Sequence, residues 1–217
     1  MSLNKIWNTK EIVNFFNNNR SSYSSLYKGE KYLISRYIKK NDSILDIGCA
    51  QGGMYKILKK KFGKINYTGI DFNKKMIELA KKKNNYKKFY FCNNNNYLRF
   101  FKKKFDSVII FGILHLNYDW KNILINAYKI SRKKILFDLR FSLFNSKTKN
   151  YLSLSLWNKS EKSLVPYVLI KEIEYLNFIN KKFKDCRLDT YSYKGKASKY
   201  SSIRSEVIFA NCCLEKL

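Results

Sequence analysis

One short stretch constrains the fold of this chain more than any other. Residues 43–47 form a short apolar run that leads into a glycine-rich segment from Gly48 to Gly53, and a helical pattern follows. A buried strand, a glycine-rich turn and a helix in this order are typical of open α/β sheets, whose ligands bind beyond the carboxyl ends of the strands. Glycines let the backbone turn sharply and approach a ligand closely. The sequence therefore predicts a ligand site where this strand ends.

Alternating strand and helix patterns continue along the chain. Strands are expected at residues 43–47, 66–70, 89–92, 105–111 and 134–139, with helices at 53–61, 74–83, 98–103 and 120–130. Two helices are expected before these elements, at 7–18 and 29–40. After them we expect a helix at 169–180 and strands at 185–193 and 206–214. Residues 152–157 fit either a loop or a strand. Such alternation implies a parallel sheet covered on both faces, and the two closing strands are expected to add an antiparallel edge. We predict a doubly wound, Rossmann-like α/β fold of seven strands, mostly parallel, with an antiparallel last strand and helices on both faces.

Two acids mark the tips of the first two strands. Asp46 stands just before the glycine-rich turn, where it is badly placed for an anionic diphosphate but suits a ligand with an ammonium or sulfonium group. Asp71 ends the second strand, at the place where an acid hydrogen-bonds the two hydroxyls of an adenosine ribose. Phe72 beside it can cover the face of an adenine ring. Together these residues favour a ligand with an adenosine part and a positive charge.

The segment from Leu45 to Gly53 resembles the first motif of class I S-adenosylmethionine-dependent methyltransferases, an acid followed by spaced glycines, with Ala50 in the place of the middle glycine. Asp71 resembles the acid of the second motif. The resemblance covers residues 44–140 well and the last third only in outline. It implies a small, single-domain methyltransferase that uses S-adenosylmethionine, similar to those of bacterial small-molecule and surface-sugar pathways.

The cofactor-binding residues follow partly from this resemblance. Gly48, Ala50 and Gly52, with Cys49 between them, would pass the methionine part of the cofactor, and Asp46 would act near its amino group. Asn93 occupies the place of the third-motif acid and can accept from the adenine amine. The expected cofactor-binding set is Arg20, Tyr27, Asp46, Gly48, Cys49, Ala50, Gly52, Asp71, Phe72, Met76, Asn93 and Phe111.

Residues 20–30 mix polar and aromatic side chains without helical order before the core begins. Such a segment is expected to fold over the cofactor as a lid. In that arrangement Arg20 reaches the carboxylate of the cofactor and Tyr27 packs on it.

The expected catalytic residues lie after the fourth and fifth strands. Residues 111–115 resemble the fourth-motif stretch that lies under the cofactor and faces the methyl acceptor. His115, the only histidine of the chain, has an ordinary pKa near 6.5 that suits a general base. Asp138 and Arg140 at the tip of the fifth strand can position an acceptor. A structural role for His115 and a local ion pair between Asp138 and Arg140 remain open alternatives.

The formal net charge of +28 is the most extreme feature of the composition. Such a charge attracts phosphate polymers and anionic membranes. Only seven of the 44 basic residues are arginines, which sequence-reading nucleic-acid sites usually favour, and asparagine is abundant. A genome bias toward A/T-rich codons therefore explains much of the charge, while a functional anionic partner stays open.

We expect a methyltransferase that acts on oxygen or nitrogen of a small molecule, a metabolite or a sugar. One alternative is an RNA methyltransferase that uses the basic surface, but no base-amine motif follows the fourth strand and the chain leaves no room for a recognition domain. A second is a noncatalytic, cofactor-binding partner protein. A third is an NAD site, because residues 48–53 also fit a loose dinucleotide fingerprint, although Asp46 stands where such sites are normally apolar.

The 217 residues suit one domain. Residues 1–40 are expected to form a helical lid or cap, 41–140 the cofactor-binding core, and 141–217 the substrate-side segment and closing strands. The five cysteines are an odd number without zinc-type spacing, which favours a protein of the reducing cytoplasm with no metal site. No signal peptide is expected, nor any apolar segment of the roughly 20 residues that a membrane span needs.

Overall fold

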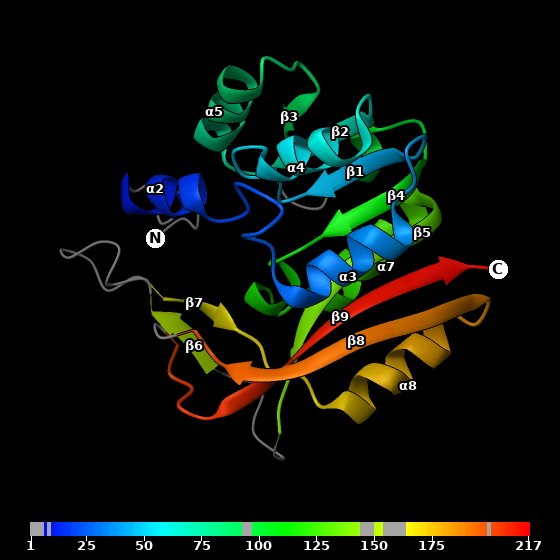
Figure 1. Cartoon of the computed structure of the whole chain (residues 1–217). Coiled ribbons are helices and arrows are strands. Elements are labelled where there is room, and N and C mark those ends of the chain that lie inside the picture. Colours follow the sequence, from blue (N-terminus) through cyan, green and yellow to red (C-terminus); the bar gives the residue numbers. More distant parts are fainter. Residues whose placement is uncertain (1–6, 8–9, 93–96, 144–149, 154–163, 199–200) are drawn as a thin grey trace.

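A seven-stranded sheet forms the centre of the molecule (Figure 1). The computed structural model describes the chain except for residues 1–6, 8–9, 93–96, 144–149, 154–163 and 199–200. The strands of this sheet are β1 (Ser43–Ile47), β2 (Asn66–Asp71), β3 (Phe89–Phe91), β4 (Phe105–Ile110), β5 (Ser131–Phe141), β8 (Cys186–Lys196) and β9 (Glu206–Lys216). Their order is β3-β2-β1-β4-β5-β9-β8. Neighbours among β1 to β5 are parallel and β9 is antiparallel to both β5 and β8, so the predicted fold class is confirmed.

Alternate residues of the strands supply the two faces of the sheet. Val108 and Ile110 of β4 belong to one apolar cluster and Ile109 to another, because successive side chains of a strand point to opposite faces. The first cluster includes buried residues of α7 (Trp120–Ile130) and α8 (Glu172–Lys182). The second includes those of α3 (Lys28–Tyr37), α4 (Gly53–Phe62) and α5 (Lys74–Asn84). Helices therefore cover both faces, as predicted.

A third apolar cluster lies at the carboxyl ends of the parallel strands. It joins Ile12 of α2 (Lys10–Asn18) to Met76 of α5 and to Val165 and Tyr167 of β7 (Leu164–Tyr167). In Figure 1 the arrowheads of β1 and β4 point toward α2 and toward the hairpin that β7 forms with β6 (Asn150–Ser153). These elements therefore border the end of the sheet where α/β folds bind their ligands.

Three details of the closing part of the chain were not predicted. The last strand, β9, lies between β5 and β8, so the edge of the sheet is β8. β5 begins at Ser131 rather than at residue 134, because the charged residues Arg132 and Lys133 hide its start in the sequence. The β6–β7 hairpin was not predicted, since Pro166 weakens the strand pattern of β7. Of the unassigned residues 152–157, those from 154 on lie outside the described part of the chain.

Two short elements complete the described structure, α6 (Tyr97–Phe100) and the 3₁₀ helix η1 (Leu114–Leu116). α3 packs against β9 and β8 and so covers the sheet, whereas α2 lies at the ligand end. In the described residues no helix combines the length and apolar character that crossing a membrane requires.

Candidate functional site

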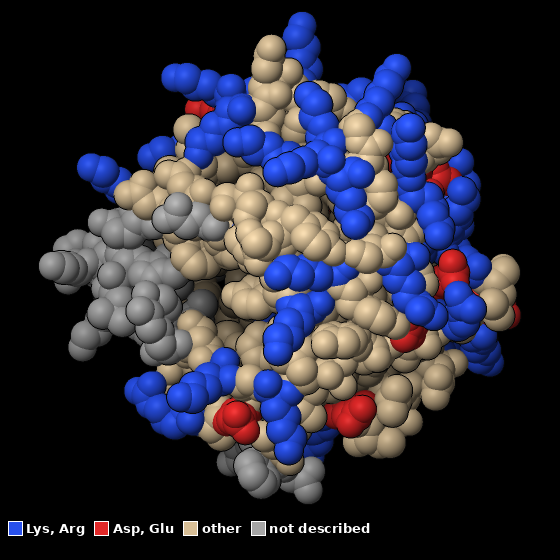
Figure 2. Space-filling view, in the orientation of Figure 1, with Lys and Arg blue, Asp and Glu red and all other residues tan. Residues whose placement is uncertain are grey.

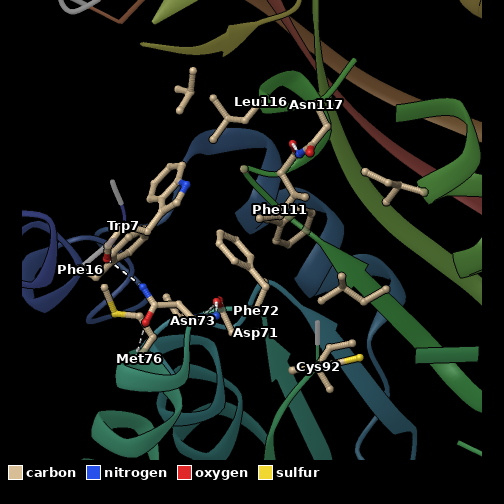
Figure 3. Close-up of a pocket in the computed structure, with 18 of the residues that line it drawn as sticks. Trp7, Phe16, Asp71, Phe72, Asn73, Met76, Cys92, Phe111, Leu116 and Asn117 are labelled. Carbon is tan, nitrogen blue, oxygen red and sulfur yellow. Dashed lines mark hydrogen bonds between the residues drawn. The ribbon is translucent and has the colours of Figure 1, made fainter. Parts of the chain in front are cut away.

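A cavity of about 740 Å³ opens at the carboxyl ends of β1, β2 and β4. Its volume lies within the roughly 300–1,000 Å³ of small-molecule pockets. Figure 3 shows Asp71 and Phe72 entering it from the end of β2, Phe111 from the end of β4, and Trp7 and Phe16 from the N-terminal side. The predicted ligand site and the observed cavity therefore coincide.

The glycine-rich turn after β1 carries three residues in the left-handed region, Gly48 (φ 81°), Ala50 (φ 44°) and Gly52 (φ 75°). The amides of Gly48 and Cys49 both donate to the carbonyl of Ile70 in β2, at 2.8 and 3.0 Å. A Cβ on Gly48 would lie only 2.4 Å from the side chain of Ile113. Gly48 and Ala50 line the cavity, so the turn presents bare backbone to a ligand.

Asp71 is the buried acid of the cavity wall. Its Oδ2 accepts from the amide of Ala50 at 3.0 Å and its Oδ1 from the amide of Asn73 at 2.9 Å. Burial raises the pKa of Asp71 to about 6, against the opposing effect of the hydrogen bonds from Asn73 and Ala50. The side chain is thereby fixed in orientation at the cavity wall.

Four residues of the predicted cofactor set are not among the lining residues of this cavity: Tyr27, Asp46, Cys49 and Gly52. Asp46 is buried and accepts a hydrogen bond from the Tyr67 hydroxyl. Burial raises its pKa to about 6, although Tyr67 and Arg20 act in the opposite direction. Cys49 is also buried, and burial raises the pKa of its thiol. A Cβ on Gly52 would lie 2.6 Å from the ring of Phe89, so Gly52 allows close packing behind the turn.

Arg20 lines the cavity and is held by a carboxylate of α3. Its Nε and Nη2 lie 2.9 and 2.6 Å from Oε1 of Glu30. The guanidinium covers Gly112, where a Cβ would lie 2.9 Å from Nη2. Against the effect of burial, Glu30 raises the pKa of Arg20, so this side chain stays charged.

Tyr27 is the N-cap of α3 and does not join Arg20 in the cavity. Its amide donates to Oε2 of Glu30 at 3.0 Å, while its ring is 45% exposed and lies 6.3 Å from that of Phe209. Glu30 therefore serves both the helix start and Arg20. The sequence signal that identifies it is a capping-box acid three residues after the helix cap.

The apolar wall of the cavity contains predicted and unpredicted residues. Phe72, Met76 and Phe111, three of the predicted cofactor-binding residues, line it, and the rings of Trp7 and Phe72 meet edge to face with centroids 6.5 Å apart. The side chain of Asn73 caps α5 by accepting from the Met76 amide at 3.2 Å, and donates to the Trp7 carbonyl at 2.8 Å. Trp7, Phe16 and Asn73 were not predicted as site residues. The aromatic residues between positions 7 and 18 indicated only an amphipathic helix. Asn93 lies outside the described residues.

The three predicted catalytic residues form a buried polar cluster next to this cavity. Oδ1 of Asp138 accepts from the amide of Gly112 at 2.5 Å, and Oδ2 from Nη1 of Arg140 at 2.6 Å. Nδ1 of His115 lies 3.9 Å from the same Oδ2. Gly112 lines the cavity, whereas the three side chains are not among its lining residues. The ion pair of Asp138 and Arg140, which the sequence left open as an alternative, is present, and the catalytic roles stay predictions.

Burial and the neighbouring arginines shape the titration of this cluster. Burial and then Arg140 lower the pKa of His115 to about 3, although Asp138 acts in the opposite direction. Against the effect of burial, Arg140 and His115 lower the pKa of Asp138. At neutral pH the cluster therefore holds a neutral imidazole beside an ionised carboxylate and a guanidinium.

Residues 38–165, more than half of the chain, match the family described as Methyltransferase domain. The chain is similar to malonyl-[acyl-carrier protein] O-methyltransferase of Priestia megaterium, with 36% identity over 76 residues that cover 31% of this chain and 28% of that protein. The present chain spans less than half the length of the curated relatives that it matches.

Two solved structures share the fold over most of the chain. A possible histamine N-methyltransferase from Thermotoga maritima superimposes with a TM-score of 0.58 at 15% identity, covering 98% of this chain and 99% of that one. Magnesium protoporphyrin IX methyltransferase from Synechocystis PCC 6803, solved with bound S-adenosylmethionine, gives a TM-score of 0.52 at 14% identity, covering 83% and 74%. The matched family region contains the glycine-rich turn, Asp71 and most of the residues that line the cavity. This chain therefore belongs to the methyltransferase-domain family, with the fold of the class I S-adenosylmethionine-dependent enzymes.

Proposed function

We propose that this protein is an S-adenosylmethionine-dependent methyltransferase that methylates oxygen or nitrogen of a small-molecule acceptor. The observation that carries the proposal is the buried carboxylate of Asp71, fixed by two backbone amides at the wall of a largely apolar cavity beside a glycine-rich turn. An oriented acid of this kind is the partner that the two hydroxyls of a ribose require.

The residues around Asp71 fit the remaining parts of the cofactor. Phe72 and Met76 offer an apolar surface to the adenine. The bare backbone of Gly48 and Ala50 accommodates the methionine part, since a side chain at Gly48 would already collide with Ile113. Arg20 at the cavity wall is the cation for the carboxylate.

When bound, S-adenosylmethionine supplies a methyl group that its sulfonium has already activated. The protein then needs to align an acceptor with that methyl group and exclude water, and alignment alone is worth up to about 7–11 kcal/mol in favourable cases. We assign the acceptor side to His115, Asp138 and Arg140, because Asp138 accepts from the amide of the lining residue Gly112 and holds Arg140 and His115 beside it.

The surface supports a small acceptor rather than RNA. Figure 2 shows lysine and arginine side chains scattered over the visible face, densest in its upper half, where Figure 1 has α4 and α5. A scattered lysine surface lacks the arginine forks with which proteins read bases. Two of the similar proteins are also named for small acceptors, one for magnesium protoporphyrin IX and the other, as a possible activity, for histamine. The described cysteines are free, which suits the reducing cytoplasm that we propose as the compartment.

Calorimetric titration with S-adenosylmethionine tests the proposal, with NAD as the competing ligand. We expect micromolar binding of S-adenosylmethionine alone, weakened at least tenfold by Asp71→Asn. Glu78→Gln makes the same chemical change at an exposed position of α5 and is expected to leave the affinity unchanged. Binding of NAD in preference, or an affinity insensitive to Asp71→Asn in a folded protein, would refute the assignment.

A further inference from the structure

The solvent-facing sides of α4 and α5 carry a dense set of lysines. Residues 53–88 contain twelve lysines, four in α4, five in α5 and three in the segments that follow the two helices, and no arginine. All twelve are exposed. The acids of this stretch are Asp71, which is buried in the cavity wall, and Glu78. The exposed lysines of residues 53–88 are called the lysine face below.

A bias toward A/T-rich codons does not by itself explain this concentration. Such a bias adds lysine along the whole chain and does not keep acids away from one face. Elsewhere on the surface acids lie among the basic residues, as Glu174 of α8 does 2.6 Å from Lys121 and Glu215 of β9 does 2.5 Å from Arg187. The upper half of Figure 2, where Figure 1 has α4 and α5, shows the basic side chains gathered together.

The two helices bring their ammonium groups close to one another. Buried residues of α4 and α5 belong to the same apolar cluster, so the two helices cover the same face of the sheet. Burial and then the neighbouring charge of Lys56 in α4 lower the pKa of Lys83 in α5. Lys83 donates to Gln51 and Asn17, whose side chains are neutral. Like charges gathered in this way repel one another, and an anionic partner relieves the repulsion.

The chemistry of the lysine face favours a lipid surface over a nucleic acid. Proteins that hold single-stranded nucleic acid combine a basic groove with aromatic rings on which the bases stack. In residues 53–88, which the structure describes throughout, every aromatic side chain is buried or half-buried, as Tyr55 is in its stack on Tyr86 at 4.3 Å. The lysines also spread over two helices and present compact point charges, without the guanidinium forks that hold individual phosphates.

We propose that the lysine face is a docking surface for an anionic phospholipid bilayer, to which the protein adsorbs through the ammonium groups of α4 and α5. Each basic residue near such a surface raises the affinity about fivefold. No large apolar side chain of residues 53–88 is exposed, so nothing on this face inserts into the bilayer and adsorption is reversible and sensitive to salt. The proposal does not depend on the methyl acceptor.

Co-sedimentation with vesicles measures the adsorption of the full chain. We expect the protein to pellet with phosphatidylcholine vesicles that contain about one-third phosphatidylglycerol, and to stay in solution with pure phosphatidylcholine. Raising the salt from about 0.1 M to about 1 M shortens the screening length from about 10 Å to about 3 Å and should release the protein. No pelleting with the anionic vesicles overturns the proposal.

Two variants of equal net charge separate the lysine face from the total charge. The face variant combines Lys56→Gln, Lys60→Gln, Lys81→Gln and Lys82→Gln, and keeps Lys59 and Lys61, whose ammonium groups lie over the rings of Tyr55 and Tyr23. The control variant combines Lys171→Gln, Lys181→Gln, Lys182→Gln and Lys184→Gln, exposed positions in or beside α8 on the opposite side of the sheet. Thermal unfolding checks that both variants fold.

We expect the face variant to lose at least about 100-fold in affinity for the anionic vesicles and the control variant to lose less than about fivefold. An equal loss in both would show that the net charge of +28 alone drives adsorption, and overturns the proposal. Acetylation of exposed lysines, measured by mass spectrometry, gives a second measurement on the unaltered chain. Vesicles should protect the lysines of α4 and α5 and leave Lys181 and Lys184 reactive, whereas protection spread evenly over the chain overturns the assignment.

Polyuridylate tests the competing partner. We expect both variants to lose affinity for this RNA to a similar extent, because a flexible polymer reaches every basic part of the surface and its binding follows the number of charges neutralised. Polyuridylate that binds more tightly than the vesicles at equal phosphate concentration, and loses affinity only in the face variant, overturns the lipid assignment in favour of a nucleic acid.

Discussion

The guanidinium of Arg20 contacts Oε1 of Glu30 through both Nε and Nη2, at 2.9 and 2.6 Å. This contact joins the segment before α3 to α3 itself, and the Arg20 guanidinium also lies against Gly112. The pair couples the segment before α3 to the end of β4. We therefore expect Arg20 to be the residue of the N-terminal segment that contacts the carboxylate of the cofactor.

Arg20→Lys tests that role. A lysine keeps the charge but loses the planar fork that contacts Glu30 through two nitrogens. Charge-assisted hydrogen bonds are worth about 1.5–3 kcal/mol, so we expect the dissociation constant of S-adenosylmethionine to rise about ten- to a hundredfold. Calorimetry measures it, and thermal unfolding serves as the control for folding. An unchanged affinity would show that Arg20 only anchors Glu30.

Asn73 offers a way to separate helix capping from closure of the cavity. Its Oδ1 accepts from the Met76 amide, and its Nδ2 donates to the Trp7 carbonyl. Asn73→Ala removes both contacts and is expected to cost about 1 kcal/mol of unfolding free energy through the lost cap. Asn73→Asp keeps the cap but cannot donate to Trp7. If Trp7 closes the adenine end, both variants weaken cofactor binding, while only Asn73→Ala loses stability in urea unfolding.

Gly48→Ala examines the close approach of backbone at the turn. The left-handed conformation costs an L residue about 1–2 kcal/mol, and the new Cβ would also meet Ile113 at 2.4 Å. We expect a loss of roughly 2–3 kcal/mol of unfolding free energy. Adding Ile113→Ala should recover the part due to the collision and leave the part due to φ. A double variant no more stable than Gly48→Ala would contradict this account.

The sequence was most informative about the ligand site where the apolar strand pattern ends and the glycine-rich turn begins. The apolar run at 43–47, the glycines after it and Asp71 predict the cavity floor, because all are local signals near the ends of two adjacent parallel strands. Trp7 and Phe16 could not be assigned in this way. They reach the cavity only through the packing of α2 and of the residues before it, and an amphipathic pattern does not say which neighbour its apolar face meets. Glu30 can be identified as a capping-box acid, but the sequence does not say that it also holds Arg20.

Side-chain direction was equally hidden from the sequence. Asp46 and Cys49 lie in the predicted motif, yet Asp46 bonds to Tyr67 and Cys49 is buried behind the turn. Adjacent residues of a strand or a tight turn point to opposite sides, so motif membership alone does not place a side chain in the cavity. The hairpin that contributes Val165 and Pro166 gave no usable strand pattern either.

The pKa of His115 predicts how stability depends on pH. An unfolded histidine binds a proton below about pH 6.5, whereas burial and Arg140 keep the folded imidazole neutral until about pH 3. Between these values the unfolded state therefore holds more protons at this residue, and its contribution to stability falls as the pH falls. Between pH 6.5 and 4 we expect this single residue to cost the wild-type protein about 3 kcal/mol relative to its value at neutral pH.

Asp46 and Asp71 act in the opposite sense. Burial raises both pKa values to about 6, above the ordinary value near 4, so in this range the folded state holds more protons at these carboxyls and gains stability as the pH falls. The two effects are separable by substitution. His115→Asn removes only the destabilising contribution, and its unfolding free energy should rise relative to wild type by about 3 kcal/mol on acidification from pH 6.5 to 4. Urea unfolding across this range measures the difference. A difference in unfolding free energy that stays constant across this range would mean that His115 titrates normally in the folded state. A histidine signal that shifts near pH 6.5 in a nitrogen-15 spectrum of the labelled protein would confirm that result independently.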